Sequence, residues 1–315
     1  MFLLYGANGY TAQLIIETAL REGLQPILAG RNELIINDLA KKYNLSCRVF
    51  DLENLDTIVQ HISDVNVVLH CAGPFMFTAK PMIEACILAG VHYLDITGET
   101  DAFEMAADAG NRAAEKGIML MPGTGFDVVP TDCMAVHLHE KMPDASHLTL
   151  AFAMRGGGLS HGTASTAAQK MGTGGLVRRN GKLEKVPTVW KHKVIDFGQK
   201  QLMAATIPWG DLVTAFHSTK IPNIAVYLAM PPKLVRTMRV ENYFQWLFRM
   251  DFVRRFIQKR IDARPAGPSE DKRNNGESYI WGEVENPKGE RLTKRFKCAE
   301  GYNLTAFMSV YILKK

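Results

Sequence analysis

The 315-residue sequence predicts an α/β fold, with a Rossmann-like doubly wound parallel sheet in about the first 125 residues and a second, mixed α/β domain after it. Short apolar runs alternate with helix-like segments as far as Met121. One of these runs, Val65–Cys71, is apolar almost throughout, as is typical of a strand covered on both faces. After Asp127 the alternation ends, which places a domain boundary near residue 128.

The chain begins with an apolar strand at Met1–Tyr5, a glycine turn and a helix at Gln13–Arg21. The glycines of the turn let the backbone approach a pyrophosphate, and the N–H groups of the first helical turn point at its oxygens. The spacing is G-x-x-G-x-x-A, which also occurs in plain turns. Its position at the start of an alternating pattern favours a dinucleotide site. The predicted binding residues of this turn are Gly6, Asn8, Gly9, Tyr10 and Thr11.

Further strands and helices complete the predicted parallel sheet, joined by right-handed crossovers. The strands are Gln25–Ala29, Cys47–Asp51, Val65–Cys71, His92–Ile96 and Ile118–Met121. The helices are Glu33–Tyr43, Asn54–Ile62, Pro81–Ala89 and Ala102–Lys116. Asn32 is placed to cap the first of these helices, and Pro81 suits a first helical turn.

The second domain, predicted over residues 129–299 for substrate binding and dimerisation, mixes helices and strands. The predicted elements are helices at Thr131–Lys141 and Ala164–Met171, strands at His147–Met154, Val186–Val194 and Ile224–Met230, and a hairpin of Tyr279–Glu285 with Arg291–Cys298. A last helix is predicted after this domain, at Leu304–Leu313. Polar Arg264–Glu277 contains two prolines and is predicted to be a mobile loop.

Three further segments follow strand ends where a dinucleotide would lie. In NAD-binding folds an acidic residue after the second strand binds the ribose, but here that position is Gly30 followed by Arg31. A guanidinium can bind a 2′-phosphate, so the sequence favours NADP(H), with NAD(H) as the alternative because Glu33 is close by. Asp51 would contact the adenine or cap the next helix. Cys71, Ala72, Gly73 and Pro74 follow the fourth strand, at the expected switch point of the sheet.

Taken together, these segments resemble the saccharopine dehydrogenase-like oxidoreductases. The matching stretches are Tyr5–Thr11, Ala29–Asn32, Cys71–Phe75, Tyr93–Glu99 and Gly125–Asp132, and later Gly162-Thr163 and Gly301-Tyr302. The sequence is most similar to the saccharopine-dehydrogenase-like branch and to the trans-acting enoyl reductases. The resemblance implies an NADP-binding domain at residues 1–128 to which residues 300–315 return, cofactor contacts from Gly125 and Phe126, and hydride transfer.

Hydride transfer often needs a proton donor beside the cofactor. The candidates are Tyr93, Asp95, Glu99, Asp127 and His161. The alternative for each carboxylate is a structural cap or a buried anchor, which we favour, and for His161 a loop histidine without a catalytic role. No combination of residues indicates a hydrolase or a metal site, and the five scattered cysteines predict reduced thiols.

The net charge of +5 comes from one segment, since nine basic and three acidic residues lie in Lys233–Arg264. This argues against nucleic-acid binding. Aromatic residues are interleaved with the arginines, so the segment is interpreted as a lid, a helix on an anionic membrane, or a dimer interface. With neither an 18-residue apolar run nor a signal sequence in view, we expect a cytoplasmic protein, associated at most with a membrane surface.

The sequence therefore predicts an NADP(H)-dependent oxidoreductase, forming a homodimer, that acts on a small or lipid-like carbonyl or enoyl substrate. One alternative is a regulatory protein that binds NADP without turnover. The other is a peripheral membrane protein that acts through its basic aromatic helix.

Overall fold

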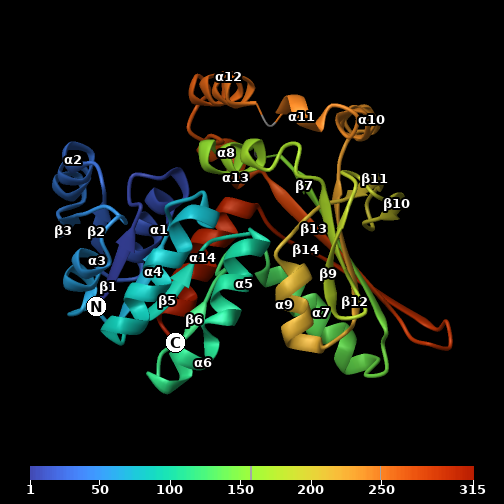
Figure 1. The fold of residues 1–315 in the computed structure, drawn as a ribbon, viewed down its shortest axis with the longest axis horizontal. Coiled ribbons are helices and arrows are strands. Elements are labelled where there is room, and N and C mark those ends of the chain that lie inside the picture. Colours follow the sequence, from blue (N-terminus) through green and yellow to red (C-terminus); the bar gives the residue numbers. More distant parts are fainter. Residues whose placement is uncertain (157, 249) are drawn as a thin grey trace. The chain divides into compact units, whose positions relative to one another are not determined.

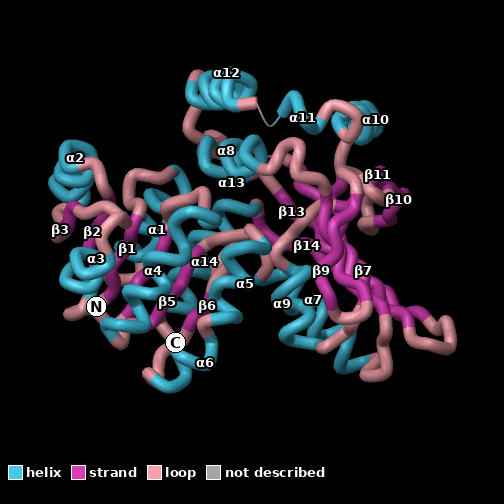
Figure 2. Tube along the Cα trace, viewed as in Figure 1, coloured by secondary structure: helices cyan, strands magenta, loops and turns pink. Residues whose placement is uncertain are grey.

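The structure is a computed structural model that describes residues 1–156, 158–248 and 250–315. The chain forms two compact units, shown as a ribbon in Figure 1 and by secondary structure in Figure 2. Unit 1 consists of Met1–Asp127 and Tyr302–Lys315, and unit 2 of Val128–Gly301. Among the described residues, no helix has the length and apolar character needed to cross a bilayer.

Unit 1 contains a six-stranded, fully parallel sheet of order β3-β2-β1-β4-β5-β6, which confirms the doubly wound fold. Its strands are β1 (Phe2–Tyr5), β2 (Ile27–Gly30), β3 (Cys47–Val49), β4 (Val67–His70), β5 (His92–Asp95) and β6 (Leu120–Met121). The strand order reverses between β1 and β4, so a crevice for ligands is expected at the carboxyl ends of these two strands.

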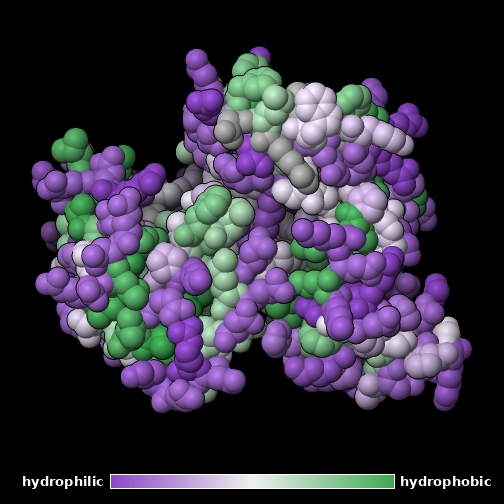
Figure 3. Space-filling model, in the orientation of Figure 1, coloured by the Kyte–Doolittle hydropathy of each residue, from purple (hydrophilic) through white to green (hydrophobic). Residues whose placement is uncertain are grey.

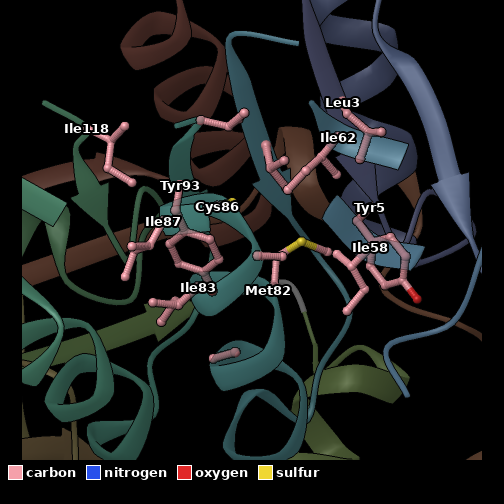
Figure 4. Close-up of a cluster of buried hydrophobic side chains, with 14 of the residues drawn as sticks. Leu3, Tyr5, Ile58, Ile62, Met82, Ile83, Cys86, Ile87, Tyr93 and Ile118 are labelled. Atoms are coloured by element: carbon pink, nitrogen blue, oxygen red, sulfur yellow. The ribbon is translucent and has the colours of Figure 1, made fainter. Parts of the chain in front are cut away.

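Helices cover both faces of this sheet because alternate residues of each strand point to opposite sides. Leu3 and Tyr5 belong to one core with α3 (Leu55–Ile62), α4 (Phe75–Ala89) and α5 (Thr100–Asp108), part of which Figure 4 shows. Phe2 and Leu4 belong to the other core with α1 (Tyr10–Arg21), α2 (Glu33–Tyr43) and α14 (Gly301–Leu313). The sheet is therefore a buried middle layer.

Several helices predicted in unit 1 have different limits. Helix α1 begins at Tyr10 and not at Gln13, and α14 begins at Gly301 and not at Leu304. The helix expected from Pro81 begins at Phe75, so Pro81 lies inside α4 and not in its first turn. The carboxylate of Glu99 accepts hydrogen bonds from the backbone of the first two residues of α4 and sets this earlier start. The segment Ala102–Lys116 forms two helices, α5 and α6 (Gly110–Glu115), interrupted at Ala109 just before a glycine of low helix propensity.

The C-terminal helix α14 packs within unit 1, although about 170 residues of unit 2 separate it in the sequence from the other helices of unit 1. Ala306 and Val310 are buried in the same core as Ile15 and Ile16 of α1. Polar contacts fix its position as well, since Thr305 Oγ1 accepts a hydrogen bond of 2.9 Å from the backbone of Phe126.

Unit 2 is built on an eight-stranded mixed sheet of order β10-β11-β12-β7-β13-β14, with β8 and β9 joined at β12. The strands are β7 (His147–Arg155), β8 (Gly175–Arg179), β9 (Lys182–Val186), β10 (His192–Asp196), β11 (Gln201–Thr206), β12 (Asn223–Ala229), β13 (Glu277–Glu285) and β14 (Arg291–Ala299). The predicted hairpin is confirmed as β13 and β14. Helix α7 (Val129–Lys141) lies so close to β13 that a Cβ at Gly282 would come within 2.6 Å of Met134 Cγ.

The sheet of unit 2 is rolled, because the two strands at its opposite ends approach each other. Arg295 of β14 forms an ion pair of 2.6 Å with Asp196 of β10. Lys193 of β10 lies over the ring of Trp281 at 4.5 Å from its centroid. Small side chains such as Ala151 and Ala204 make room inside the roll for Tyr227 and Trp281.

The prediction for unit 2 missed several elements. The predicted strand Val186–Val194 is wrong, because β9 ends at Val186 and β10 begins at His192. Strands β8 and β11 and helix α9 (Asp211–Thr219) were not predicted. The predicted loop Arg264–Glu277 contains the short helix α13 (Glu270–Asn274). The basic segment forms α10 (Pro232–Glu241), α11 (Gln245–Phe248) and α12 (Asp251–Asp262). Of the predicted segments, Gly157 and Arg249 lie outside the described residues.

Candidate functional site

The glycine turn after β1 folds closely onto the sheet. Gly6 has a φ of +83°, and its N–H and that of Ala7 donate to the carbonyl oxygen of Ala29 at 2.8 and 3.1 Å. A Cβ at Gly6 would lie 2.8 Å from the backbone nitrogen of Ala72, which follows β4. Glycine is therefore required at this position both by the left-handed backbone and by the neighbouring chain.

The turn opens directly into helix α1, whose first turn carries no charge that would compete with an anion. Gly9 is the N-cap and has ordinary extended angles, φ −67° and ψ 150°. It supplies no side-chain cap, and no acidic residue lies in the first helical turn. A Cβ at Gly9 would come 3.2 Å from the carbonyl oxygen of Gly6. The dipole of α1 and the glycine backbone before it therefore favour a phosphate at this position.

The segment after β4 lies beside this turn, at the switch point predicted from the sequence. The carbonyl oxygen of Cys71 is 3.8 Å from the position of a Cβ at Gly9. Thr78 Oγ1 donates to the carbonyl oxygen of Ala72 at 2.6 Å and holds the segment on α4. Burial raises the pKa of the Cys71 thiol, so the thiol is uncharged where it borders the site. The structure therefore brings Gly6–Gly9 and Cys71–Gly73 together.

The ends of β2 and β3 form the other side of the turn. Asn8 Oδ1 lies 3.8 Å from the position of a Cβ at Gly30, and Arg31 next to it is exposed. Burial, and after it the charge of Asp51, raise the pKa of Tyr5 to about 12, whereas Arg31 lowers it. A basic and an acidic side chain thus act on the same phenol at this edge of the sheet.

Asp51 does not cap the next helix, so that alternative is wrong. Its Oδ1 accepts a hydrogen bond of 3.0 Å from the backbone of Glu53, and the cap of α3 is the Asn54 side chain. A turn of this kind forms locally between residues two positions apart. It leaves the exposed carboxylate of Asp51 at the end of β3, near the predicted adenine position.

Asp95 and Tyr93, two of the predicted catalytic candidates, form a buried structural pair at the end of β5. Asp95 accepts hydrogen bonds from the Tyr93 hydroxyl at 2.7 Å and from the backbone of Thr97 and Gly123 at 2.9 and 2.8 Å. Burial raises the pKa of Asp95 to about 6, against the lowering effect of these three donors. The bonds join the ends of β5 and β6, which is the role of an anchor.

Glu99 is also engaged in the fold. Its two carboxylate oxygens accept the backbone N–H groups of Phe75 and Met76 at 2.8 and 3.0 Å, and its side chain is buried. This carboxylate interacts favourably with the positive end of the α4 dipole, directly after Gly73 and Pro74. The start of α4 is therefore occupied by the protein's own anion, in contrast to the start of α1.

Asp127 differs from these two carboxylates. It is half-buried, and its Oδ2 would lie 2.9 Å from a Cβ at Gly98. Burial raises the pKa of Asp127 to about 7, and the charges of Glu99 and Asp95 add to this shift. A carboxyl group of this pKa exchanges protons near neutral pH. The loop that holds it is tied to α14 through Phe126, and a Cβ at Gly125 would collide with Thr305 at 2.6 Å.

His161 belongs to unit 2 and is the first residue of α8 (His161–Gln169). Its Nε2 is 2.6 Å from the carbonyl oxygen of Arg264, and the side chain of Ser160 caps the helix. A backbone partner at this distance ties the imidazole to the loop after α12, which is consistent with the alternative of a loop histidine.

Three further residues around the turn were not among the predicted site residues. Tyr302 at the start of α14 packs edge-on against Tyr10, with 5.2 Å between the ring centroids. Thr305 holds the Gly125-Phe126 backbone as described above. His70 at the end of β4 is fully buried, and burial lowers its pKa to about 3, so it is a neutral donor to Thr78 Oγ1 at 3.0 Å. Only the Gly301-Tyr302 pair gave a sequence signal. In the described part of the chain, no group of His, Cys, Asp and Glu side chains could hold a metal ion.

Comparison with known families agrees with this geometry. Residues 2–121 match the family model of the saccharopine dehydrogenase NADP-binding domain. The match lies entirely within the first segment of unit 1, so this part of the chain is similar to the saccharopine dehydrogenase NADP-binding domain. The matched range ends at β6 and includes the glycine turn, the end of β2 and the switch-point segment.

The similarity to curated proteins extends beyond this domain. The saccharopine dehydrogenase-like oxidoreductase of Homo sapiens is 28% identical over 202 residues, which are 56% of this chain and 47% of that protein. The lipid droplet localized protein of Caenorhabditis elegans is 25% identical over 279 residues, 77% of this chain and 63% of that protein. The chain thus covers about half the length of the first curated relatives that it matches.

The fold is also that of a solved saccharopine dehydrogenase. The apo L-Glu-forming enzyme from Saccharomyces cerevisiae aligns over 98% of this chain and 88% of its own chain, with a TM-score of 0.61 and 13% identity. Similarity at this level of identity shows a shared fold, and the reaction and substrate rest on other arguments.

Proposed function

We propose that the protein is an NADP(H)-dependent oxidoreductase that transfers a hydride to or from a small or lipid-like carbonyl or enoyl substrate. The observation that carries this proposal is the bare glycine turn of Gly6–Gly9, which lies against Cys71–Gly73 at the switch point of a saccharopine dehydrogenase-type domain. Several of its relatives are named oxidoreductases, which supports turnover over a purely regulatory role.

The residues of the turn and the strand ends fit the parts of the cofactor. Gly6, Asn8 and Gly9, with Tyr10 and Thr11 in the first turn of α1, would hold the pyrophosphate. Arg31 would bind the 2′-phosphate, because its guanidinium is exposed at the end of β2 and can form a bidentate contact with a phosphate. Asp51 would contact the adenine.

The segment Cys71–Gly73 would border the nicotinamide, which supplies the hydride when the cofactor is bound. Pro74 follows this segment. Gly125 and Phe126 belong to the loop after β6 and would lie on the other side of the nicotinamide.

Asp127 is the proton carrier in this proposal. Its pKa is about 7, which is close to neutral pH. The other two carboxylates at this edge have structural roles, since Asp95 accepts three hydrogen bonds and Glu99 caps α4. In the protonated form it would donate a proton to the oxygen or carbon that becomes negative as hydride arrives. Brønsted behaviour favours a donor whose pKa is close to the working pH.

The test is NADPH oxidation by the full chain over a panel of small carbonyl, long-chain carbonyl and enoyl substrates, with NADPH binding measured separately through its own fluorescence. We expect tight NADPH binding and turnover with at least one substrate class, lost in Asp127→Asn while NADPH binding persists. Binding without turnover over the whole panel would favour the regulatory alternative. Failure to bind NADPH or NADH would refute the proposal.

A further inference from the structure

Helices α10–α12 of unit 2 expose large apolar and basic side chains side by side, and we call this the basic aromatic surface. Its exposed apolar residues are Leu234, Val240, Tyr243, Phe244, Trp246, Met250, Phe252 and Phe256. Its exposed basic residues are Lys233, Arg236, Arg239, Arg255, Lys259 and Arg260. In Figure 3, hydrophobic and hydrophilic side chains meet over these helices at the top of the view.

Helix α12 shows how this surface arises. One side of the helix faces α8, because Ile261 is buried and Gln258 Nε2 donates to Ser165 Oγ at 3.0 Å. Phe252 and Phe256 are one helical turn apart and lie on the other side, each 59% exposed. An ordinary surface helix turns its large apolar residues toward the core, so the direction of these two rings is not explained by packing within the chain.

The basic residues of α12 share the outward side with the two rings. Arg255 and Lys259 are also one turn apart and exposed, and at 100° per residue their positions fall beside those of Phe252 and Phe256. Arg260 lies over the Phe256 ring, 5.3 Å from its centroid. The outward face therefore combines aromatic insertion and positive charge within one helix.

We propose that the basic aromatic surface binds the surface of an anionic phospholipid membrane. Phe252 and Phe256 would enter the boundary between headgroups and acyl chains, and Arg255 and Lys259 would reach the lipid phosphates with their apolar stems along the same boundary. Charge complementarity selects this occupant, since lysine is depleted from protein interfaces whereas an anionic lipid surface attracts each cation.

The proposal is tested with the full chain and sedimented vesicles of phosphatidylcholine, either alone or with about a third phosphatidylglycerol. We expect binding to the anionic vesicles that falls as salt is raised, and little binding to the neutral ones. Each basic residue near such a surface contributes a factor of about five. Arg255→Gln with Lys259→Gln should therefore lower the partition coefficient by about 25-fold.

Two further variants separate the mechanism from non-specific charge. Phe252→Ser with Phe256→Ser keeps the charge and should weaken binding to anionic vesicles at least about tenfold, because the inserted area is lost. Lys288→Gln with Lys294→Gln removes two exposed lysines near the β13–β14 turn and should leave binding unchanged. All of the substituted side chains are exposed, and circular dichroism with size-exclusion chromatography confirms that each variant is folded.

Three results would overturn the proposal. The first is an absence of binding to phosphatidylglycerol vesicles. The second is an equal loss of binding in the Lys288 and Lys294 control, which would mean that only net charge acts. The third is a homodimer in solution that dissociates in the double phenylalanine variant while the wild type ignores vesicles, which would make the surface an interface between two copies. None of these measurements requires cofactor or substrate, so they are independent of the proposed oxidoreductase activity.

Discussion

Substituting alanine for each of the two turn glycines should separate folding from cofactor binding. At Gly6 the φ of +83° costs an alanine about 1–2 kcal/mol. The new Cβ would also lie 2.8 Å from the Ala72 backbone, and forcing a core apart in this way costs about 1–3 kcal/mol. Gly6→Ala should therefore destabilise unit 1 by about 2–5 kcal/mol.

Gly9→Ala should instead lower cofactor affinity and leave the stability of unit 1 almost unchanged. Its backbone angles suit alanine, and the tight 3.2 Å contact with Gly6 O limits the change in stability to about 1 kcal/mol in either direction. The added methyl group would stand between the α1 donors and the pyrophosphate. Charge-assisted hydrogen bonds contribute about 1.5–3 kcal/mol each, so NADPH affinity should fall at least about tenfold. Gly9→Val should abolish binding while the protein stays folded.

The tryptophans allow the assay to resolve the two units. Trp190, Trp209, Trp246 and Trp281 all lie in unit 2, so their fluorescence reports on that unit alone. In urea, Gly6→Ala should move the far-ultraviolet dichroism transition to lower denaturant and leave the tryptophan transition in place, and NADPH fluorescence gives the affinities. An unchanged dichroism midpoint in Gly6→Ala, or full NADPH affinity in Gly9→Ala, would refute this account of the turn.

Three other predictions concern single side chains. Arg31→Ala should lower NADPH affinity about tenfold or more with little effect on NADH, measured by titrating both; an unchanged preference would remove Arg31 from the site. If Asp127 donates the proton, turnover should fall as pH rises through about 7. Because the pKa of Asp127 is raised in the folded state, the folded protein keeps a proton that the unfolded chain loses above a pH of about 4. Asp127→Asn should therefore raise the melting temperature more at pH 8 than at pH 5, and a pH-independent effect would contradict this. Glu99→Ala should cost about 2–4 kcal/mol in urea unfolding, since the N–H groups of Phe75 and Met76 lose their acceptor, and Glu99→Gln, which keeps one acceptor oxygen, should cost less.

Local signals explain how much of unit 1 could be predicted. The helix Glu33–Tyr43 has its predicted limits because the Asn32 side chain accepts a hydrogen bond from Ile35, three residues away. The start of α4 could not be predicted in the same way, because its cap is Glu99, 24 residues later in the sequence. Contacts of this length are set by the sheet, which brings the ends of β4 and β5 together.

Unit 2 was predicted less well because its strands depend on distant partners. Strand β11 pairs with β10 and β12, and half of its residues are not buried, so alternation is weak in the sequence. The hairpin of β8 and β9 had a local signal that was overlooked, since Asn180 and Gly181 both have positive φ, as the turn of a tight hairpin requires.

For the candidate site, the sequence predicted the glycine turn and the switch-point segment that the structure brings together. It could not rank the carboxylates, because burial and hydrogen bonds decide that ranking. Asp95 and Glu99 accept backbone hydrogen bonds that anchor the ends of β5 and α4, whereas burial and the charges of these two carboxylates raise the pKa of Asp127 to about 7.

The packing of α14 within unit 1 has a consequence for the order in which the chain is synthesised. A ribosome releases β1–β6 first, then the whole of unit 2, and only then the helix that covers Ile15 and Ile16. Until that moment the nucleotide-binding unit exposes an apolar strip on α1, and the loop of Gly125 and Phe126 lacks the Thr305 contact. Unit 2 can fold as soon as it has been synthesised, since its residues are contiguous in the sequence. The emerging chain should therefore acquire a folded second unit before its first unit is complete, and cofactor binding should appear only after the second unit has folded.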